Sequence, residues 1–402
     1  MRKIIHLYTE NKPLLQKLDA VSIISTKSDP SLLVRRLLHY FKQKKQLKSQ
    51  KNILIAVLNW GLGHATRCIP IIDEFIKQRA NVVLASDGDA LLLLQQKYPN
   101  LTRIELPAYG IHYKGDNMLL NILPQVPKII NAICLERKKL NSIIQDHQIT
   151  TIISDNRFGM YHKKIPSIFL THQLNIQIPY PWLESIVAKF NHYFIRKFDE
   201  CWVPDVEAEP SLAGLLSHQK KLKNVRYIGV LSRMSIPTQL SLKWDVLVVL
   251  SGPEPQRTYL EQKIIAQAKN LPFQFLIVAG RPSVREEREI GKNIFWRSFM
   301  NQKELEQAMA QSRVLVTRSG YSTIMDLVAM ECHKVLLIPT PGQTEQEYLA
   351  NRFAEAGTFL CQPQNALNLE KGIGYLMQHE MKQLAKPIAI SLKDAILSCL
   401  SR

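Results

Sequence analysis

The sequence has no long hydrophobic run and no paired cysteines. No stretch approaches the roughly 20 apolar residues of a transmembrane helix, and the N-terminus lacks the charged-then-apolar order of a signal peptide. The six cysteines lie far apart, without a CxxC pair or clustered histidines, so neither the spacing of a zinc site nor a disulfide framework is present. These absences predict a cytoplasmic protein with reduced thiols and no bound metal.

The composition indicates an ordinary globular protein. Of the 402 residues, 46% are hydrophobic and 21% are charged, with no sign of a collagen, a coiled coil or a wholly disordered chain. A chain of this length exceeds a single hydrophobic core. We therefore expect two α/β domains that enclose a cleft.

The formal charge of +18 is concentrated at the N-terminus, where the first 51 residues carry 12 Lys or Arg against 3 acids. Residues 1–51 are therefore expected to form a basic extension. Its segment 32–48 fits a basic amphipathic helix on anionic lipid or RNA, or else a poorly ordered, solvated tail. No RRM or KH signature accompanies the charge, so nucleic acid is not the expected partner. Peripheral contact with the inner face of a membrane is the partner interaction that this charge suggests.

From residue 52 onward, short β-branched runs alternate with helical periods, which is typical of parallel sheets with crossover helices. The strands expected in a first series are 53–58, 81–86, a stretch near 102, 151–154, 167–170 and 201–204. The second series comprises 245–250, 273–280, 293–296, 314–317 and 334–339. Pro and Gly punctuate the stretch between them, so we place the connection near 230–242. The expected fold class is α/β, with two Rossmann-like doubly wound domains at 52–235 and 236–402.

The clearest motif of the first half is NWGLGHATR, residues 59–67, directly after the first strand. Gly61 and Gly63 allow a tight turn, and His64 stands at the start of a helix. Thr66 occupies the place of the third glycine of a dinucleotide fingerprint, so NAD is not expected. An imidazole with a pKa near neutrality can take a proton from an attacking hydroxyl. His64 is therefore the candidate general base, with helix capping as the alternative.

Other strand ends of the first half carry polar side chains. Asp155 and Arg157 follow one strand, and His172 and Gln173 follow the next. They are candidates for binding the acceptor together with Gly61 and Gly63, although a buried structural hydrogen-bond network explains them nearly as well.

Three loops of the second half suit a nucleotide-sugar donor, because helix N-termini after parallel strands bind phosphates. In RSGYSTIMD, Arg318, Ser319 and Gly320 suit a diphosphate, and Asp326 suits ribose hydroxyls. In SGPEPQRT, the phosphate candidates are Ser251, Gly252 and Arg257. In PTPGQTEQEYLAN, the candidates for sugar hydroxyls are Gln343, Gln346 and Glu347.

The RSG block with Asp326 and the following Gln346-Glu347 helix resembles the donor domain of family 28 glycosyltransferases, which include the lipid II-forming N-acetylglucosaminyltransferase. The resemblance implies a GT-B fold with a UDP-sugar in the C-terminal half. It implies diphosphate contacts from Arg318, Ser319 and Gly320, ribose contacts from Asp326, and sugar contacts from Gln346 and Glu347. The family acid is usually Glu, its second glutamine is Glu347 here, and GLGH replaces a longer glycine run. GLGHATR is also similar to the loop of GT-B-fold UDP-sugar hydrolases of pseudaminic acid synthesis, where the histidine activates water.

These features predict an inverting, metal-independent glycosyltransferase with a UDP-sugar as substrate and no cofactor. The acceptor is an unidentified hydroxyl compound, and a lipid-linked one would explain a basic extension, because anionic membranes attract Lys and Arg. A UDP-sugar hydrolase or 2-epimerase of the same fold is the first alternative. A non-catalytic protein that binds a nucleotide sugar or RNA is the alternative from another class.

Overall fold

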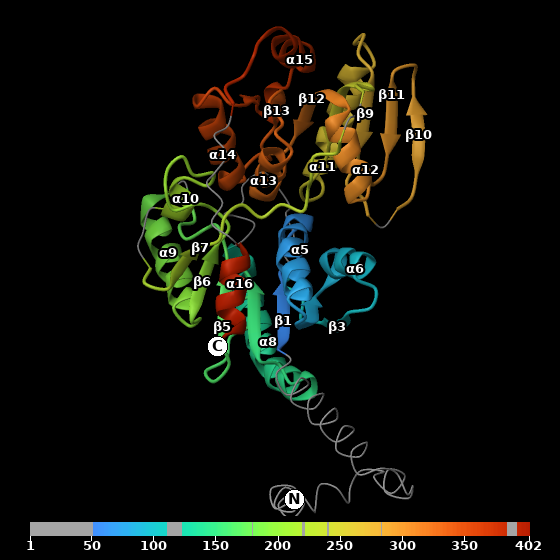
Figure 1. The fold of residues 1–402 in the computed structure, drawn as a ribbon. Helices are drawn as coiled ribbons and strands as arrows, with labels where there is room; N and C mark the ends of the chain where they lie inside the picture. Colours follow the sequence, from blue (N-terminus) through green and yellow to red (C-terminus); the bar gives the residue numbers. More distant parts are fainter. Residues whose placement is uncertain are drawn as a thin grey trace, which may run out of the picture. The chain divides into compact units, whose positions relative to one another are not determined.

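The computed structural model describes residues 51–110, 123–178, 180–218, 222–238, 241–282, 284–383 and 392–402. The chain divides into two units, Met1–Gln50 and Lys51–Arg402. Apart from Lys51, the predicted basic extension with its segment 32–48 lies outside the described residues. The second unit contains two seven-stranded sheets with helices around them (Figure 1).

The first sheet has the strand order β3-β2-β1-β4-β5-β6-β7, and its strands pair in parallel. All strands predicted for this half are present, and the short β7 is additional. The strands are β1 (Asn52–Val57), β2 (Asn81–Ser86), β3 (Thr102–Glu105), β4 (Thr151–Asp155), β5 (Ser167–Leu170), β6 (Glu200–Val203) and β7 (Val225–Tyr227). The helices are α5 (Leu62–Lys77), α6 (Gly88–Lys97), α8 (Val126–His147), α9 (Pro181–Ile195) and α10 (Leu215–His218), with the 3-10 turn η1 (Leu123–Gln125).

The second sheet has the order β10-β11-β9-β8-β12-β13-β14, in which only the β10–β11 pair is antiparallel. The sequence pattern predicted five of these strands and missed the polar β10 and the two-residue β14. The strands are β8 (Trp244–Val249), β9 (Phe275–Val278), β10 (Glu287–Ile290), β11 (Ile294–Arg297), β12 (Ser312–Thr317), β13 (Val335–Leu337) and β14 (Leu360–Cys361). The accompanying helices are α11 (Gln256–Ala268), α12 (Gln302–Ala310), α13 (Tyr321–Ala329), α14 (Thr344–Glu355) and α15 (Leu369–Gln378), with the 3-10 turn η2 (Gln364–Ala366).

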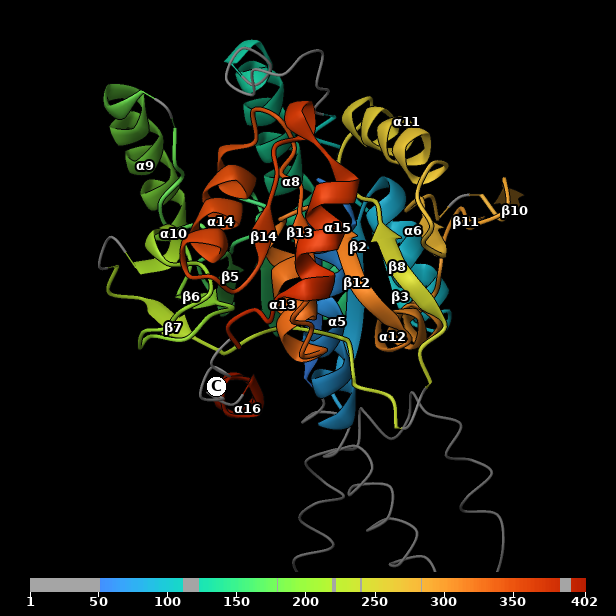
Figure 2. The ribbon, with the colours of Figure 1, turned by 90° about the horizontal axis from the view of Figure 1, so that it is seen from above.

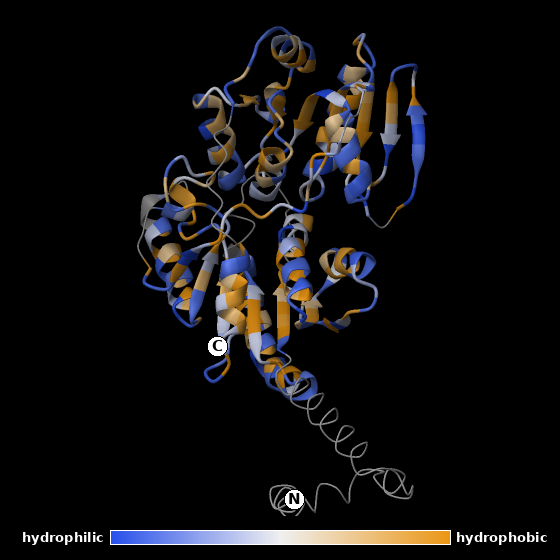
Figure 3. Ribbon diagram, in the orientation of Figure 1, coloured by the Kyte–Doolittle hydropathy of each residue, from blue (hydrophilic) through white to orange (hydrophobic). Residues whose placement is uncertain are grey.

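Burial explains why the inner strands read as continuous apolar runs. Residues 53–57 of β1 and 246–248 of β8 have no exposed surface, because parallel strands are covered by helices on both faces. Figure 3 shows the inner strands in hydrophobic colours and β10 as hydrophilic. No helix in the described part of the chain is long and apolar enough to cross a bilayer.

The two halves are joined by the stretch between β7 and β8, whose described residues form neither helix nor strand. The last helix, α16 (Leu392–Leu400), returns to the first half and packs against α5 (Figure 1). Its neighbour Arg402 forms an ion pair with Glu200 of β6. The sequence pattern alone gave no indication of this return, which fastens the end of the chain to the first sheet.

Each sheet has one topological switch point, where the chain proceeds to one side and later returns to the other. In the first sheet it lies between β1 and β4, and in the second between β8 and β12. Ligands of doubly wound sheets bind outside the strand ends at such points. His64 follows β1 and Asp155 ends β4, while Gly252 follows β8 and Arg318 follows β12. The strongest sequence candidates therefore lie at the two switch points.

Candidate active site

The two switch points meet where the starts of α5 and α13 come together. Helix α13 packs on α5, as the view from above shows (Figure 2). The Ser322 hydroxyl donates a hydrogen bond to the Gly63 carbonyl at 3.0 Å. A Cβ atom on Gly63 would lie 3.0 Å from Ser322 Oγ, so glycine permits this close approach. Gly61, with a φ of 85°, makes the turn into α5.

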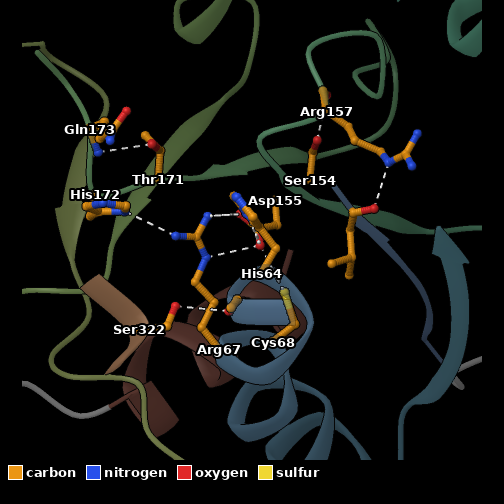
Figure 4. A network of polar contacts seen from close by, with 12 residues as sticks. His64, Arg67, Cys68, Ser154, Asp155, Arg157, Thr171, His172, Gln173 and Ser322 are labelled. Atoms are coloured by element: carbon orange, nitrogen blue, oxygen red, sulfur yellow. Dashed lines mark hydrogen bonds and ion pairs between the residues drawn. The ribbon is translucent and has the colours of Figure 1, made fainter. Parts of the chain in front are cut away.

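A buried carboxylate organises the first-half side of this contact (Figure 4). Asp155 has no exposed surface and receives hydrogen bonds from Arg67, of which the Nε bond measures 3.0 Å. His64 Nδ1 lies 3.1 Å from Asp155 Oδ2. Burial alone would raise the pKa of Asp155, but Arg67 and His64 hold it down at about 2. Asp155 is therefore a permanent anion at neutral pH.

His64 has the environment of a neutral base. Burial and the nearby Arg67 lower its pKa below the ordinary value of 6.5, although Asp155 acts in the opposite direction. When Nδ1–H donates to Asp155, Nε2 keeps a free lone pair. The His64 side chain retains 16% exposure, whereas the Asp155 side chain has none. The imidazole can therefore meet a substrate while its partner is shielded.

His172 and Gln173 lie beside this cluster and reach the second half. His172 Nδ1 is 3.1 Å from Arg67 Nη1, and His172 Nε2 is 2.9 Å from Glu345 Oε1 of α14. Gln173 donates to the other oxygen of Glu345. The His172 ring stacks on Tyr321, with 4.2 Å between ring centroids and 8° between planes. A continuous polar chain thus joins the two halves.

The second-half switch point contains a cation without an acidic partner. Arg318 is 1% exposed and donates to the carbonyls of Gln256, Ile338 and Pro339. No carboxylate in the described part of the chain pairs with it, and burial lowers its pKa to about 10, so it stays charged at neutral pH. Its Nε atom has no hydrogen-bond partner among the described residues.

A second polar atom without a partner among the described residues, Thr340 Oγ1, lies near Arg318 Nε, close to Gly252. Thr340 is 1% exposed, and its Oγ1 likewise lacks a partner among the described residues. A Cβ atom on Gly252 would lie 3.5 Å from Thr340 Oγ1 and 3.9 Å from Arg318 Nε. Buried polar groups normally have partners. A donor N–H, a hydroxyl and a side-chain-free glycine therefore surround one position that suits an anionic oxygen.

Several of the remaining donor-loop candidates form hydrogen bonds that stabilise the loops themselves. The Ser319 hydroxyl donates to the Gln346 carbonyl at 2.7 Å, and Gly320 is the residue before α13. Gln346 accepts from Thr340 N–H at 2.9 Å and donates to Gln343. Glu347 accepts from Gly342 N–H at 3.0 Å. These side chains fold back because they occupy the first turn of α14, where free loop amides lie within reach. Ser251 lies directly after β8, next to Gly252.

Two further candidates, Arg257 and Arg157, form ion pairs with carboxylates. The Arg257 guanidinium pairs with Glu254 and Glu261, so its charge is already neutralised. Arg157 is fully buried between Asp87 and Glu136, and its Nε donates to the Val57 carbonyl at 2.7 Å. Both guanidinium groups thus take part in ion pairs, and for Arg157 this is a buried structural network, the alternative to acceptor binding that the sequence leaves open. A phosphate contact of Arg257 stays a prediction.

Asp326 turns toward the connection between the halves. Its Oδ1 accepts from Ser232 Oγ at 2.6 Å. Ser232 belongs to the stretch between β7 and β8 that joins the halves, so this hydrogen bond fastens the second turn of α13 to the connection. The ribose contact that the family resemblance implies for Asp326 stays a prediction.

Sequence reasoning missed four residues of the site: Arg67, Thr340, Glu345 and Tyr321. Arg67 and Tyr321 belong to motifs that were singled out, and Glu345 and Thr340 stand inside the third donor loop. Their spacing carried a usable signal for Arg67, which is three residues after His64 and therefore on the same helix face. The roles of Glu345 and Thr340 depend on contacts across the fold, which spacing does not reveal.

The fold and the paired switch points define a GT-B protein, with two Rossmann-like sheets that meet at their ligand-binding edges. Residues 247–397 match the Glycosyltransferase family 28 C-terminal domain. The resemblance of the donor half to family 28 is thereby confirmed.

Relatives and solved structures agree with this class. A protein of Methanosarcina acetivorans named "Uncharacterized glycosyltransferase" is 24% identical over 323 residues, which cover 76% of this chain and 82% of the relative. The spinosyn rhamnosyltransferase SpnG, complexed with thymidine diphosphate, aligns with a TM-score of 0.52 at 12% identity over 88% of this chain and 92% of its own. A Listeria monocytogenes protein assigned as a UDP-N-acetylglucosamine 2-epimerase aligns with a TM-score of 0.59 at 12% identity, over 87% and 95%. The family match and the relative support a glycosyltransferase, and the structures support the fold.

The buried position of Asp326 predicts that the free energy of unfolding depends on pH. Burial raises its pKa to about 6, with a smaller contribution from Glu306, while Ser232 and Arg233 act in the opposite direction. Between about pH 4 and pH 6 the unfolded chain loses this proton and the folded chain keeps it, so stability should fall as pH rises through this window. Asp326→Asn removes the fall and should stabilise the protein at pH 8 by on the order of 1–2 kcal/mol, and much less at pH 4.

Urea unfolding at pH 4, 6 and 8 measures this difference. Asp89→Asn, at an exposed position of α6, is the control and should leave the pH slope unchanged. An Asp326→Asn variant with the same pH slope as the parent would contradict the assignment.

Proposed function

We propose that the protein transfers a sugar from a UDP-sugar to a hydroxyl acceptor, with inversion and without a metal ion. The observation that carries the proposal is the position of His64: hydrogen-bonded to Asp155 at one switch point, it stands next to the start of α13 at the other. The donor lies in the second half and the acceptor in the first. His64 Nε2 takes the proton of the acceptor hydroxyl as its oxygen attacks the anomeric carbon. A single displacement inverts the configuration at that carbon.

The donor diphosphate lies beside Gly252, where Arg318 Nε and Thr340 Oγ1 border one position. Arg318 Nε, Thr340 Oγ1 and the free N–H groups at the start of α13 stabilise the negative charge that the diphosphate gains as it leaves. Arg318 supplies a fixed positive charge in a buried setting, so the site stabilises the leaving group without a metal. Gln343 and Glu347, at the start of α14, each use one side-chain oxygen for a loop hydrogen bond, and their other polar atoms bind the sugar hydroxyls. The family 28 match and a related fold that holds thymidine diphosphate support a nucleoside diphosphate here.

The acceptor is lipid-linked, and the exposed face of α9 supports this. Ile186, Phe190 and Tyr193 follow each other at helical spacing and are 56%, 42% and 56% exposed. Lys189 lies exposed on the same helix, and Lys197 Nζ stands 4.5 Å from the Tyr193 ring centroid. An apolar strip flanked by lysines suits the surface of an anionic membrane, which is where a lipid-linked acceptor resides.

A hydrolase or 2-epimerase of the same fold is the second candidate function. The observation in its favour is Glu345, which places a further carboxylate beside His64 and His172. In a hydrolase, His64 would activate water instead of an acceptor hydroxyl. The two reactions differ in their need for an acceptor.

His64→Ala tests the proposed chemistry. UDP release from a panel of UDP-sugars should require a membrane extract as the acceptor source and should fall by roughly 10²- to 10⁴-fold in the variant, because the base is lost. The wild-type pH profile should keep its acidic limb below pH 6.5, since the pKa of His64 is lowered. His218→Gln is the control, because the hydrogen bonds of His218 to described residues all lie in the first half. Release without extract would favour the hydrolase or epimerase, and failure to bind any UDP-sugar would exclude the proposal.

Thr340→Val tests the diphosphate position. The variant removes a hydroxyl that has no hydrogen-bond partner among the described residues, so thermal stability should be unchanged or slightly higher. UDP should bind about tenfold more weakly, which corresponds to one lost hydrogen bond to a charged group. Titration calorimetry measures the affinity.

Thr317→Val, which removes a 3.0 Å hydrogen bond to the Val249 carbonyl, is the control. It should lower the thermal stability but keep the UDP affinity. Equal UDP affinity of Thr340→Val and the parent would place the diphosphate elsewhere.

Replacing Ile186, Phe190 and Tyr193 by Ser tests the membrane face. Sedimentation with anionic phospholipid vesicles at 1 M salt isolates the apolar contribution, because the Debye length then falls to about 3 Å and the basic extension is screened. The triple variant should bind at least about fivefold more weakly than the parent. A Tyr259→Ser, Tyr375→Ser double variant, changed at exposed positions of α11 and α15, should bind like the parent. Unaltered binding of the triple variant would remove α9 from the acceptor side.

A further inference from the structure

Arg67 lies within hydrogen-bond distance of both Asp155 and His64. Whether it donates to His64 Nδ1 determines whether His64 can act as a base. Arg67 Nη2 lies 2.9 Å from His64 Nδ1, and Asp155 Oδ2 lies 3.1 Å from the same nitrogen. If His64 Nδ1–H donates to Asp155, Nε2 keeps its lone pair. If Arg67 donates to Nδ1, the proton of the neutral imidazole is on Nε2, which then cannot accept another. Arg67 Nη2 also donates to Asp155 Oδ1, so its distance to His64 Nδ1 does not by itself require that nitrogen to accept. The orientation of Arg67 therefore selects the reactive tautomer.

The other end of the Arg67 guanidinium is held by His172. Arginine has donors only, so the 3.1 Å contact of its Nη1 with His172 Nδ1 requires that Nδ1 accept. The proton of the neutral His172 ring must then be on Nε2. Glu345 Oε1 lies 2.9 Å from that nitrogen and accepts the proton's hydrogen bond. The Glu345 carboxylate thus fixes the one tautomer of His172 that can hold Arg67.

Neighbouring contacts fix Glu345 and His172 in place. Gln173 donates to the second oxygen of Glu345. The His172 ring stacks on Tyr321, whose hydroxyl donates to the Pro204 carbonyl at 2.7 Å. Neither ring flip of His172 nor rotation of Glu345 is possible without breaking one of these contacts.

We infer that Glu345 is a positioning residue for the base: through His172 it holds Arg67 on Asp155, and so it keeps the tautomer of His64 whose Nε2 accepts a proton. The inference rests on the proposed role of His64. The chain Glu345–His172–Arg67–Asp155–His64 begins on α14, the helix that follows the third donor loop, and ends at the base of the other half. The base is therefore competent only while the two halves keep this contact.

The charges around His64 come from three elements and the loop after β5. Arg67 lies on α5, Asp155 on β4, His172 after β5, and Glu345 on α14. Loss of the Glu345 charge removes a nearby anion, which disfavours the protonated imidazole. The acidic limb of the rate profile should then move to lower pH.

The variants Glu345→Ala and Glu345→Gln distinguish a positioning role of Glu345 from a general effect on the folded structure. In Glu345→Ala, kcat should fall about 10- to 100-fold and the KM for the UDP-sugar should change less than about twofold, because only the base is misaligned. Glu345→Gln should restore most of kcat, since its amide oxygen still accepts from His172 Nε2–H. Both variants should move the acidic limb to lower pH. Glu209→Ala is the matched control: its ion pair with Arg352, at 3.3 Å, also joins the halves but does not touch His172, and it should leave kcat unchanged.

A spectroscopic readout keeps this test independent of turnover. With ¹⁵N-labelled histidine, His64 should be protonated on Nδ1 in the full-length parent and should shift toward Nε2 protonation in Glu345→Ala. A parental tautomer in Glu345→Ala, or equal loss of kcat in Glu345→Ala and Glu345→Gln, would overturn the inference. Full transfer activity of His64→Ala would instead overturn the base assignment of the proposed function, which distinguishes the two failures.

Discussion

The pairing of a fully buried carboxylate with a buried guanidinium is the interaction on which the site depends. Asp155 ends the central strand β4, and Arg67 reaches it from the first helix. An unpaired buried charge would cost several kcal/mol, so the two side chains fix each other and the start of α5. His64 Nδ1 and Cys68 Sγ also lie 3.1 Å and 3.5 Å from Oδ2 of the same carboxylate. One ion pair thus sets the position of the candidate base and of the first turn of α5 that contains it.

The contrast between the two switch points explains their different chemistry. In the first half, the buried anion Asp155 is neutralised by Arg67, and the site holds an imidazole of lowered pKa. In the second half, the buried cation Arg318 meets only carbonyl groups among the described residues, and its Nε is unpaired. The first arrangement suits proton transfer, and the second suits an anionic ligand. Their contact through Gly63 and Ser322 brings the two kinds of chemistry together.

Much of the fold and part of the site could be predicted from the sequence, for physical reasons. Buried parallel strands such as β1 and β8 read as unbroken apolar runs, and glycine at Gly61 and Gly252 marks turns with positive φ. Short or polar strands, such as β10 with its Glu-Arg-Glu start, lack that signal. Placement at a switch point follows from strand order, so His64, Asp155 and Arg318 were accessible to sequence reasoning. The direction of the Asp326 side chain was not, because its partner Ser232 lies 94 positions away in the sequence. The ion pairs of Arg257, in contrast, join residues three and four positions apart, a spacing that the sequence does show.

A crystal structure of the protein with UDP bound shows whether His64 meets a donor diphosphate across the two halves. Phosphate oxygens should lie within hydrogen-bond distance of Arg318 Nε and Thr340 Oγ1, beside Gly252, with the terminal phosphate facing His64 Nε2. A diphosphate bound away from Gly252, or one with His64 outside the donor cavity, would contradict this arrangement.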